Sequence, residues 1–497
     1  MKKRKKVITT ILKVCTWCIG FGVIFFVCSG ILKPKYFFDS ASQSPETEMW
    51  KAFYEEPENS IDVIFLGSSH IYNGVNPLVF YEETGLTGFD LASSSQDIPT
   101  GYFYLKEALE YQTPKYVLLD SYGILNKAFE NEAAYKRSLD DMRWSAVKIE
   151  AIREWQKHLE GVRLLPRIFT IMDYHSRWDS LSEEDFSDSK FITNRNGYCP
   201  VFTADENVVY NAFDVHINEP EIDETTRKYI KSMVDLCENN NIKLCLISVP
   251  DTEWTRGNST AIQKLANELS IPFLDYNTEE LFVKIGIQDG KDWMNSGHLN
   301  SYGAEKFTAF LAESLYENEV LANQSEKNGS ENRWKQKIEK WNSQYQIGKL
   351  KETWTLSEYF DQLVEFKAQE YSIFMTVKED ASKFMNEEAV EKFQELGLKA
   401  LLYDLWDISY YAVITPDEIY EEKGKEPLVY HGSTHDSEFS VFSAGKEYGN
   451  RCSVIINDTE YALNQRGLNI VVFDHERQKV IDSVCFDLHE PEWEAFR

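Results

Sequence analysis

Basic residues are scarce in most of this 497-residue chain. The first 36 residues hold eight Lys or Arg and no acidic residue, so the remainder carries 44 basic against 81 acidic residues, a formal charge of −37. Binding of nucleic acid depends on Lys and Arg side chains paired with phosphates. The sequence therefore predicts that neither DNA nor RNA is a partner.

Cysteine is scarce as well, with eight in the whole chain. Three of them lie in one apolar segment near the N-terminus, and no CxxC-plus-His pattern occurs elsewhere, so we expect no zinc site. The sequence also gives no reason to expect a cofactor. Only Cys452 and Cys485 are candidates for a disulfide pair.

Charge is absent from one long stretch near the N-terminus. Cys15–Leu32 holds eighteen uncharged residues and follows the basic start MKKRKK. That length roughly spans the apolar core of a bilayer, and a basic flank favours the cytoplasmic side. We therefore expect a cytoplasmic basic tip and a transmembrane anchor over residues 1–33, with the rest of the chain outside the cytoplasm. A cleaved signal peptide, disfavoured because no A-x-A-like site follows, and a buried globular helix are the alternatives.

Residues 34–318 alternate between strand and helix patterns. This alternation predicts an α/β domain with three layers, in which a parallel sheet lies between two layers of helices. Residues 124–225 interrupt the alternation, and we expect this helical insertion to form a lid or a partner surface. The predicted strands lie at 61–66, 87–95, 115–123, 243–250 and 271–277.

The chain changes character after residue 318. Residues 319–345 are polar and nearly free of aliphatic side chains, which predicts a partly helical linker. Residues 346–497 contain strand-like segments and one amphipathic helix at 387–396, which predicts a second, β-rich domain. Its predicted strands lie at 371–379, 398–406, 410–415, 452–463, 468–474 and 479–487.

Small polar residues follow the predicted strands of the first domain. Ligands of parallel sheets bind beyond the carboxyl ends of the strands, so these residues are expected around one site. A serine nucleophile there needs a base within hydrogen-bond reach, usually with a third group that orients the base. His298, in the loop before the last helix of this domain, is the candidate base. The strand-end residues are Ser68, Ser69, Ser95, Tyr122 and Pro250.

Three segments give the first domain a family resemblance. FLGSSH (65–70), DLASSSQ (90–96) and NSGHLNSYGAEKF (295–307), in this order, resemble the SGNH (GDSL-like) hydrolases. They are most similar to membrane-anchored bacterial members, including proteins of teichoic-acid D-alanylation and polysaccharide O-acetylation. The resemblance covers roughly residues 55–318. It implies that Ser69 is the nucleophile and that His298 is the base.

The resemblance also implies which groups stabilise the oxyanion. These are the backbone N–H groups of Ser69 and Ser95, although the family usually has glycine at the position of Ser95, where the backbone conformation is easier for glycine. Ser68 stands where the family usually has Asp and is the weaker candidate nucleophile. His70, although adjacent, is expected to point elsewhere. The Gly-x-Asn-Asp block of the family is not recognisable.

The acid that orients the base in this family is missing from its usual place. Three residues before His298 the sequence has Asn295. An Asp-to-Asn exchange in the serine-protease triad lowers turnover about 10⁴-fold, whereas Asn serves as the orienting group in Cys–His–Asn enzymes. Asn295 is therefore one candidate orienting residue, and Asp292 is the alternative acid.

The C-terminal region has a resemblance of its own. Residues 456–487, through the segments RGLNIVV and DSVCFD, resemble the interleukin-like EMT inducer domain and the stem domain of a protein O-mannose N-acetylglucosaminyltransferase. The resemblance covers roughly residues 350–490 and implies a compact β-rich module. By analogy with the stem domain, it also implies glycan binding.

Together these features predict a single-pass membrane protein that transfers or hydrolyses an O-linked acyl group on a cell-envelope glycopolymer. The expected partners are a polysaccharide or teichoic-acid-like polymer and a membrane protein that donates the acyl group. Two alternatives stay open: a non-catalytic glycan-binding or scaffold protein with a degenerate hydrolase domain, and an esterase acting on peptides or lipids.

Overall fold

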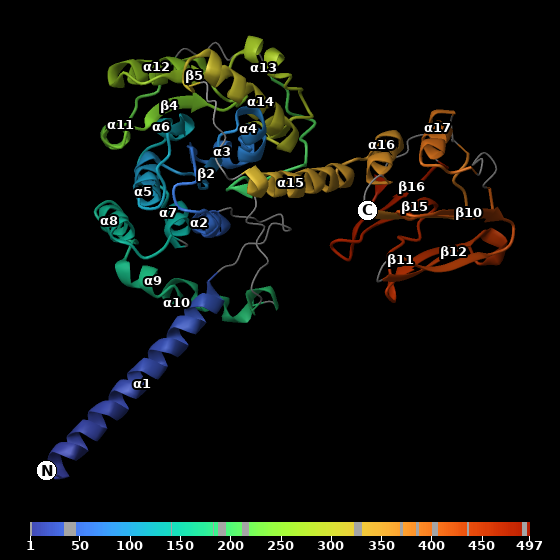
Figure 1. Ribbon diagram of the computed structural model, residues 1–497, viewed down its shortest axis with the longest axis horizontal. Helices are drawn as coiled ribbons and strands as arrows, with labels where there is room; N and C mark the ends of the chain where they lie inside the picture. The colour runs from blue at the N-terminus through green and yellow to red at the C-terminus, as the bar shows by residue number, and fades with distance from the viewer. Residues whose placement is uncertain are drawn as a thin grey trace. The chain divides into compact units, whose positions relative to one another are not determined.

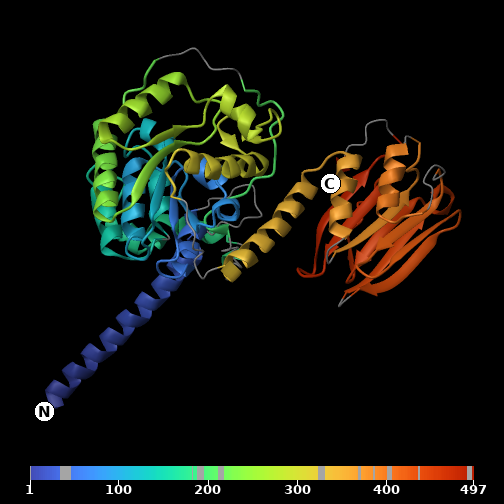
Figure 2. The same cartoon turned by 45° about the horizontal axis from the view of Figure 1, so that its top comes forward.

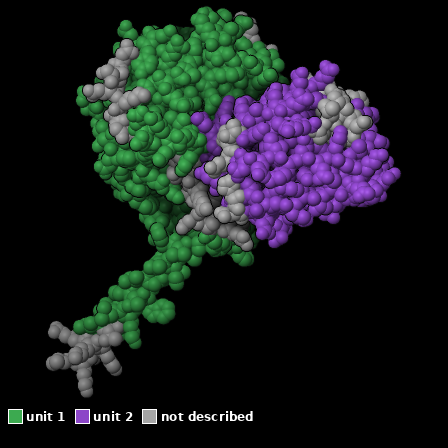
Figure 3. Space-filling model, turned by 45° about the vertical axis from the view of Figure 1, so that its right-hand side comes forward, with its two compact units in different colours: residues 1–341 green, residues 342–497 purple. Residues whose placement is uncertain are grey.

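The computed structural model describes most of the chain and divides it into two compact units, residues 1–341 and 342–497 (Figure 3). Each unit is presented by itself below. The described residues are 2–33, 46–140, 142–181, 183–186, 195–210, 218–322, 331–367, 371–383, 387–399, 406–434, 437–489 and 495–497.

A five-stranded parallel sheet forms the centre of the first unit. Its strand order is β2-β1-β3-β4-β5, and all four neighbouring pairs are parallel. Each strand lies in one of the apolar runs predicted above, so the predicted parallel α/β domain is confirmed. The strands are β1 (Val63–Gly67), β2 (Gly88–Ala92), β3 (Tyr116–Asp120), β4 (Lys243–Ser248) and β5 (Phe273–Asp275).

Helices cover both faces of this sheet and complete the three layers (Figures 1 and 2). Side chains alternate between the faces of a strand: Ile64 and Leu66 join one hydrophobic core, and Val63 and Phe65 join the other. The first layer contains α2 (Glu46–Glu55), α5 (Ile98–Ala108), α8 (Ala146–Trp155), α11 (Glu224–Asn239) and α12 (Arg256–Leu269). The second contains α3 (Ser69–Gly74), α4 (Pro77–Thr84), α13 (Glu279–Ile285) and α14 (Ser301–Glu317).

The predicted insertion is helical where the structure describes it. After β3 the chain forms a series of short helices, of which α8 packs in the first layer. The others are α6 (Tyr122–Leu125), α7 (Glu132–Asp140), α9 (Leu164–Ile168), α10 (Ile171–Tyr174), and the 3₁₀ turns η1 (His175–Asp179) and η2 (Glu183–Phe186).

The N-terminal segment forms one long helix, α1 (Lys2–Leu32). Within it, Thr10–Leu32 is long and apolar enough to cross a membrane, and most of its side chains are exposed. Ser29 and Leu32, at its C-terminal end, are buried. A cleaved signal sequence has the same character. The apolar N-terminal helix predicted from the sequence is therefore present.

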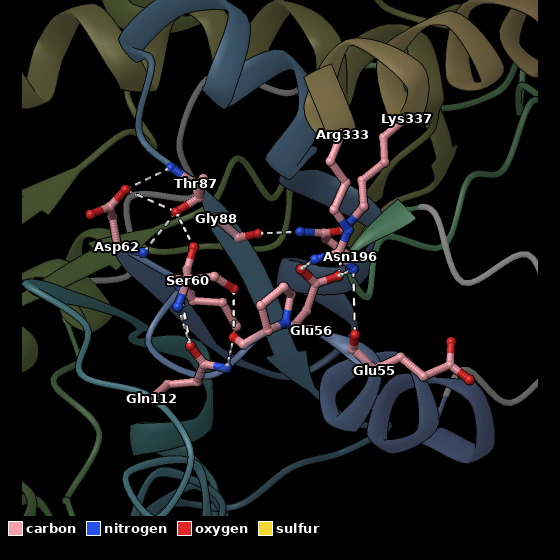
Figure 4. Close-up of polar contacts among 12 residues, drawn as sticks. Glu55, Glu56, Ser60, Asp62, Thr87, Gly88, Gln112, Asn196, Arg333 and Lys337 are labelled. Atoms are coloured by element: carbon pink, nitrogen blue, oxygen red, sulfur yellow. Dashed lines mark hydrogen bonds and ion pairs between the residues drawn. The ribbon is translucent and has the colours of Figure 1, made fainter. Parts of the chain in front are cut away.

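The expected, partly helical linker at 319–345 contains the start of a helix, α15 (Glu331–Lys351), and this helix is packed. Trp334, Lys337 and Trp341 share one face of it and are buried. Figure 4 shows Lys337 and Arg333 directed at Glu56: Lys337 Nζ lies 2.6 Å from Oε1, and Arg333 Nη1 lies 2.9 Å from Oε2. The prediction missed this face because it counted aliphatic residues, and here tryptophan provides the apolar surface.

The described part of the second unit is a β-sandwich with helices packed on one of its sheets. A six-stranded sheet has the order β10-β9-β8-β15-β16-β17, and a four-stranded sheet has the order β11-β12-β13-β14. One core fills the space between the sheets, and α16 (Leu356–Lys367) and α17 (Glu387–Glu395) cover the other face of the larger sheet. The strands are β8 (Tyr371–Lys378), β9 (Ser409–Ile414), β10 (Ile419–Gly424), β11 (Leu428–Thr434), β12 (Ser437–Ala444), β13 (Arg451–Ile456), β14 (Thr459–Glu460), β15 (Gly467–Asp474), β16 (Lys479–Phe486) and β17 (Ala495–Phe496).

This unit agrees with the predicted β-rich domain and differs from it in detail. Strands β10, β11 and β12 were not predicted, and most of the strand expected at 398–406 lies outside the described residues. Cys452 and Cys485, the candidate disulfide pair, are both buried free thiols. Burial raises the pKa of the Cys452 thiol to about 12.

Candidate active site

Ser69 stands at the point where the first strand turns into a helix. β1 ends at Gly67, and α3 begins at Ser69 itself. A side chain at Gly67 would have no room, because its Cβ would lie 2.7 Å from Ile71 Cγ1 and 2.8 Å from Asp120 Cβ. The close packing of this corner therefore requires glycine, and it presents Ser69 at the carboxyl end of the sheet.

The candidate base, His298, is 229 positions from Ser69 in the sequence but lies next to it in the structure. His298 begins β7 (His298–Leu299), which pairs with β6 (Trp293–Asn295) in a short hairpin. Its Nε2 lies 2.6 Å from Ser69 Oγ. On the other side of the ring, Nδ1 lies 2.9 Å from Asn295 Oδ1. The structure thus brings together Ser69, His298 and Asn295 in the order that a serine nucleophile, its base and an orienting group require.

Asp292 is not placed to orient His298, which corrects its interpretation as the alternative acid. Its buried carboxylate uses Oδ2 to accept hydrogen bonds from Lys306 Nζ at 2.6 Å and from the N–H of Gln288 at 2.7 Å. These partners tie the loop before β6 to α14. The orienting position next to His298 is occupied by Asn295, which sits opposite His298 in the hairpin register.

Ser95, at the position where the resembled family usually has glycine, has a left-handed backbone conformation. It follows β2 and has φ +52°, in the left-handed region, where a residue with a Cβ is higher in conformational energy than glycine. Ser95 lines the same pocket as Ser69. A serine therefore has the glycine-type backbone at this position, and it lies beside the pocket.

A second histidine lies directly against the base. His70, which the sequence analysis expected to point elsewhere, stacks on His298 with ring centroids 4.6 Å apart. Its Nδ1 lies 3.3 Å from Ser68 Oγ, and its Nε2 lies 3.3 Å from Asp251 Oδ2. Ser68, His70 and Asp251 are all buried. Ser68 therefore contacts the buried His70, whereas Ser69 contacts His298, and all four residues line the pocket described below.

The two histidines have opposite pKa shifts. Burial and the adjacent His70 lower the pKa of His298 to about 4, against the opposing charge of Asp251. Burial also acts to lower the pKa of His70, but the contact with Asp251 and the charge of Asp120 outweigh it and raise the pKa overall. His298 is consequently neutral near pH 7, which is the form that accepts a proton from serine.

A pocket of about 360 Å³ opens at these residues. Four of the five strand-end residues line it together with His70 and His298, namely Ser68, Ser69, Ser95 and Tyr122, whereas Pro250 does not. Much of its wall comes from the insertion, through Asn126, Lys127, Glu130, Asn131, Ala134, Tyr135, Ser138 and Trp155. None of these wall residues was predicted individually, but all of them belong to segment 124–225, which was expected to form a lid or a partner surface.

The described residues contain no group of three His, Cys, Asp or Glu side chains arranged to hold a metal ion. Nucleophile, base and orienting amide instead form a set suited to acyl transfer through serine.

Comparison with known proteins adds partial structural likenesses. No protein-family model and no curated protein matches the sequence. A "putative acylhydrolase" of Bacteroides fragilis is 12% identical, with a TM-score of 0.27 over 57% of this chain and 99% of its own. A GDSL-like lipase of Bacteroides thetaiotaomicron is 15% identical, with a TM-score of 0.22 over 52% of this chain and 88% of its own. These likenesses are too weak to assign a function, so the proposed roles of Ser69 and His298 depend on the geometry of the site.

Proposed function

We propose that the protein is an extracytoplasmic serine esterase or O-acyltransferase that acts on a cell-envelope glycopolymer. The observation that carries this proposal is the 2.6 Å contact between Ser69 Oγ and His298 Nε2. At that distance the neutral imidazole accepts the hydroxyl proton as Ser69 attacks an ester carbonyl.

In the first half-reaction Ser69 Oγ bonds to the carbonyl carbon, and its proton moves to His298 Nε2. The oxyanion that forms faces the backbone N–H groups of Ser69 and Ser95. Collapse of this intermediate expels the alcohol, which takes the proton from His298, and leaves an acyl group on Ser69. In the second half-reaction water or an acceptor hydroxyl gives its proton to His298 and attacks the acyl carbon. The bond between this carbon and Ser69 Oγ then breaks, and Ser69 takes the proton back from His298.

Asn295 gives the site its particular character. Its Oδ1 accepts from Nδ1–H of His298 and so keeps Nε2 free to act as base. Unlike an aspartate, it adds no negative charge to stabilise the imidazolium. We therefore infer a slower or more specialised catalyst than one with a charged orienting group.

The pocket favours a polar substrate. Its wall supplies carboxylate, amide, hydroxyl and ammonium groups together with Tyr135 and Trp155, a mixture that suits hydroxylated sugars. A volume of about 360 Å³ fits a short acyl group and one or two sugar units better than a long lipid chain. Polysaccharide or a teichoic-acid-like polymer is therefore the proposed partner, with a membrane protein as acyl donor.

Labelling with a fluorophosphonate tests the proposal, because this reagent reacts only with an activated serine. We expect the full-length protein to be labelled, Ser69→Ala to lose the label, and His298→Ala to lose most of it. Ser68→Ala is the matched control and should retain the label, because Ser68 is buried against His70. Equal labelling of Ser69→Ala and the unmodified protein would refute the assignment. Absence of any acylation would favour the non-catalytic glycan-binding or scaffold alternative.

A further inference from the structure

Large apolar side chains are exposed on the part of the insertion that follows α8. They come from four consecutive short elements, α9, α10, η1 and η2, and we call them the apolar collar. Trp178 is 72% exposed and Phe186 is 64% exposed, unusually high values for side chains of this size. The apolar collar consists of Leu165, Ile168, Met172, Trp178 and Phe186.

The elements of the collar contact the C-terminal end of α1. The rings of Phe169 and Phe25 meet edge to face with centroids 5.1 Å apart. Thr170 Oγ1 donates a hydrogen bond to the carbonyl of Ser29 at 3.0 Å, and Arg177 Nη1 donates to the carbonyl of Leu32 at 2.9 Å. The carbonyl of Ser29 also accepts the N–H of Lys33 at 3.1 Å. The collar segment therefore adds donors to two carbonyls in the last turn of α1, where intrahelical partners run out.

The collar segment is also fastened to the α/β domain. Arg167, which is buried, forms an ion pair with Asp140 of α7, with Nη1 2.5 Å from Oδ1. The hydroxyl of Tyr174 donates to the other oxygen of the same carboxylate at 2.7 Å. These bonds hold the backbone of the segment, so the apolar side chains are exposed from a structured surface.

The position of these contacts along α1 sets their depth. Thr10–Leu32 has 23 residues, which at 1.5 Å per residue gives about 35 Å, slightly more than the apolar core of a bilayer. Phe25 lies seven residues before Leu32, or about 10 Å along the helix. The collar therefore meets α1 at the level where the acyl chains give way to headgroups, the depth at which Trp and interfacial helices are found.

We propose that the apolar collar inserts into the outer interface of the same bilayer that α1 spans. The partner is a lipid surface, and the inference rests on the proposed transmembrane role of α1. The attraction is apolar, since the chain after residue 36, with a formal charge of −37, gains nothing from an anionic headgroup layer. Insertion is accordingly expected to be insensitive to salt.

Photo-crosslinking in the full-length protein tests this contact. The protein is reconstituted in nanodiscs of phosphatidylcholine and phosphatidylglycerol, with p-benzoylphenylalanine in place of one residue at a time. Placed at Trp178 or Phe186, the probe should form lipid adducts at low and at high salt. Val283, 76% exposed on α13, is the matched control and should form almost none.

A fourth position separates failure of the collar from failure of the anchor. Ile19 lies in the middle of the apolar stretch of α1 and should give strong lipid adducts. Adducts at Ile19 without adducts at Trp178 and Phe186 would overturn the collar proposal and leave the anchor intact. No lipid adduct at Ile19 would overturn both. Adducts between Trp178 and another protein, in place of lipid, would mark the collar as a protein-binding surface and also overturn the proposal.

Discussion

The imidazole ring of His70 lies against that of His298, with an interplanar angle of 27°. His70 has a raised pKa because Asp251 and Asp120 favour its charged form over the effect of burial. A positive charge at this distance disfavours a second one on His298. The pair thus keeps the base neutral under acidic conditions.

Removal of the His70 charge should shift the acid limb of the activity profile. The base works when neutral, so kcat/KM falls as pH drops below the pKa of His298, which is about 4. Burial, the larger cause of the lowered pKa of His298, remains in His70→Gln, but the cationic neighbour is gone. The limb should therefore move part of the way up toward the ordinary histidine value of about 6.5. The pH dependence of kcat/KM for an aryl acetate measures this. An unchanged limb would show that His70 does not affect the base.

A charged orienting residue should accelerate the reaction. Asn295→Asp keeps the hydrogen bond to Nδ1 of His298 and adds the charge that stabilises the imidazolium. We expect turnover of an aryl acetate to rise about tenfold or more, with the acid limb shifted upward because the charged base is favoured. Asp292→Asn is the comparison, since its carboxylate contacts Lys306 and leaves His298 untouched. Asp292→Asn should lower the melting temperature and should not raise turnover. A rise in turnover in Asp292→Asn would contradict the assignment of Asn295 as the orienting residue.

The left-handed backbone at Ser95 should be easier for glycine. Ser95→Gly removes about 1 kcal/mol of strain, so the melting temperature should rise slightly. Turnover should persist because the N–H remains. Ser94→Gly, one residue earlier, has no positive φ to relieve and should destabilise by up to about 1 kcal/mol. Equal effects of the two changes, measured by thermal unfolding and esterase assay, would contradict the role of φ.

Loss of the buried ammonium on α15 should destabilise the first unit. Lys337→Met leaves Glu56 buried with Arg333 as its remaining charged partner, at a cost of about 3 kcal/mol. Lys335 on the same helix is largely exposed, so Lys335→Met should change stability by less than about 0.5 kcal/mol. Urea unfolding followed by tryptophan fluorescence compares them. Similar midpoints for both variants would mean that the contact with Glu56 contributes little.

The second unit should fold when isolated, since it contains hydrophobic cores of its own. A fragment covering residues 342–497 is expected to melt in one cooperative transition by calorimetry. Its proposed glycan binding is checked separately on a panel of envelope polysaccharides. Cooperative melting with no binding on any of them would reduce the unit to a structural or protein-binding role.

The sequence reveals those parts of the fold that depend on neighbouring residues. β1 is a run of apolar residues ending at a glycine, and Asn76 caps α4 by accepting the N–H of Leu78 at 3.0 Å. β10 has the sequence IYEEKG and is mostly solvent-facing, so it shows no apolar run and was missed. A solvent-facing strand of this kind forms because it pairs with a neighbouring strand, here β9, and its own amino-acid composition does not reveal that pairing.

Only the site residues that belong to short recognisable motifs could be predicted from the sequence. Ser69 and His298 belong to recognisable segments, and their contact spans 229 positions. The choice between Asn295 and Asp292 depends on a hairpin register that spacing alone does not determine. The contact between His70 and Asp251 has no local signal in the sequence. The two residues follow different strands, β1 and β4, and meet because both strands end at the same edge of the parallel sheet.

The division of the pocket between two parts of the chain has a consequence for its evolution. Ser69 and Ser95 follow strands of the parallel sheet, and His298 lies in the β6–β7 hairpin. The packing of this region tolerates little change, as the crowded corner at Gly67 illustrates. The opposite wall belongs to the insertion, which the sheet does not need for its own pairing. Mutations in that wall can therefore accumulate without disturbing the reacting groups. One inherited reaction centre can in this way be fitted to different polymers, by natural drift or by exchange of a single segment in the laboratory.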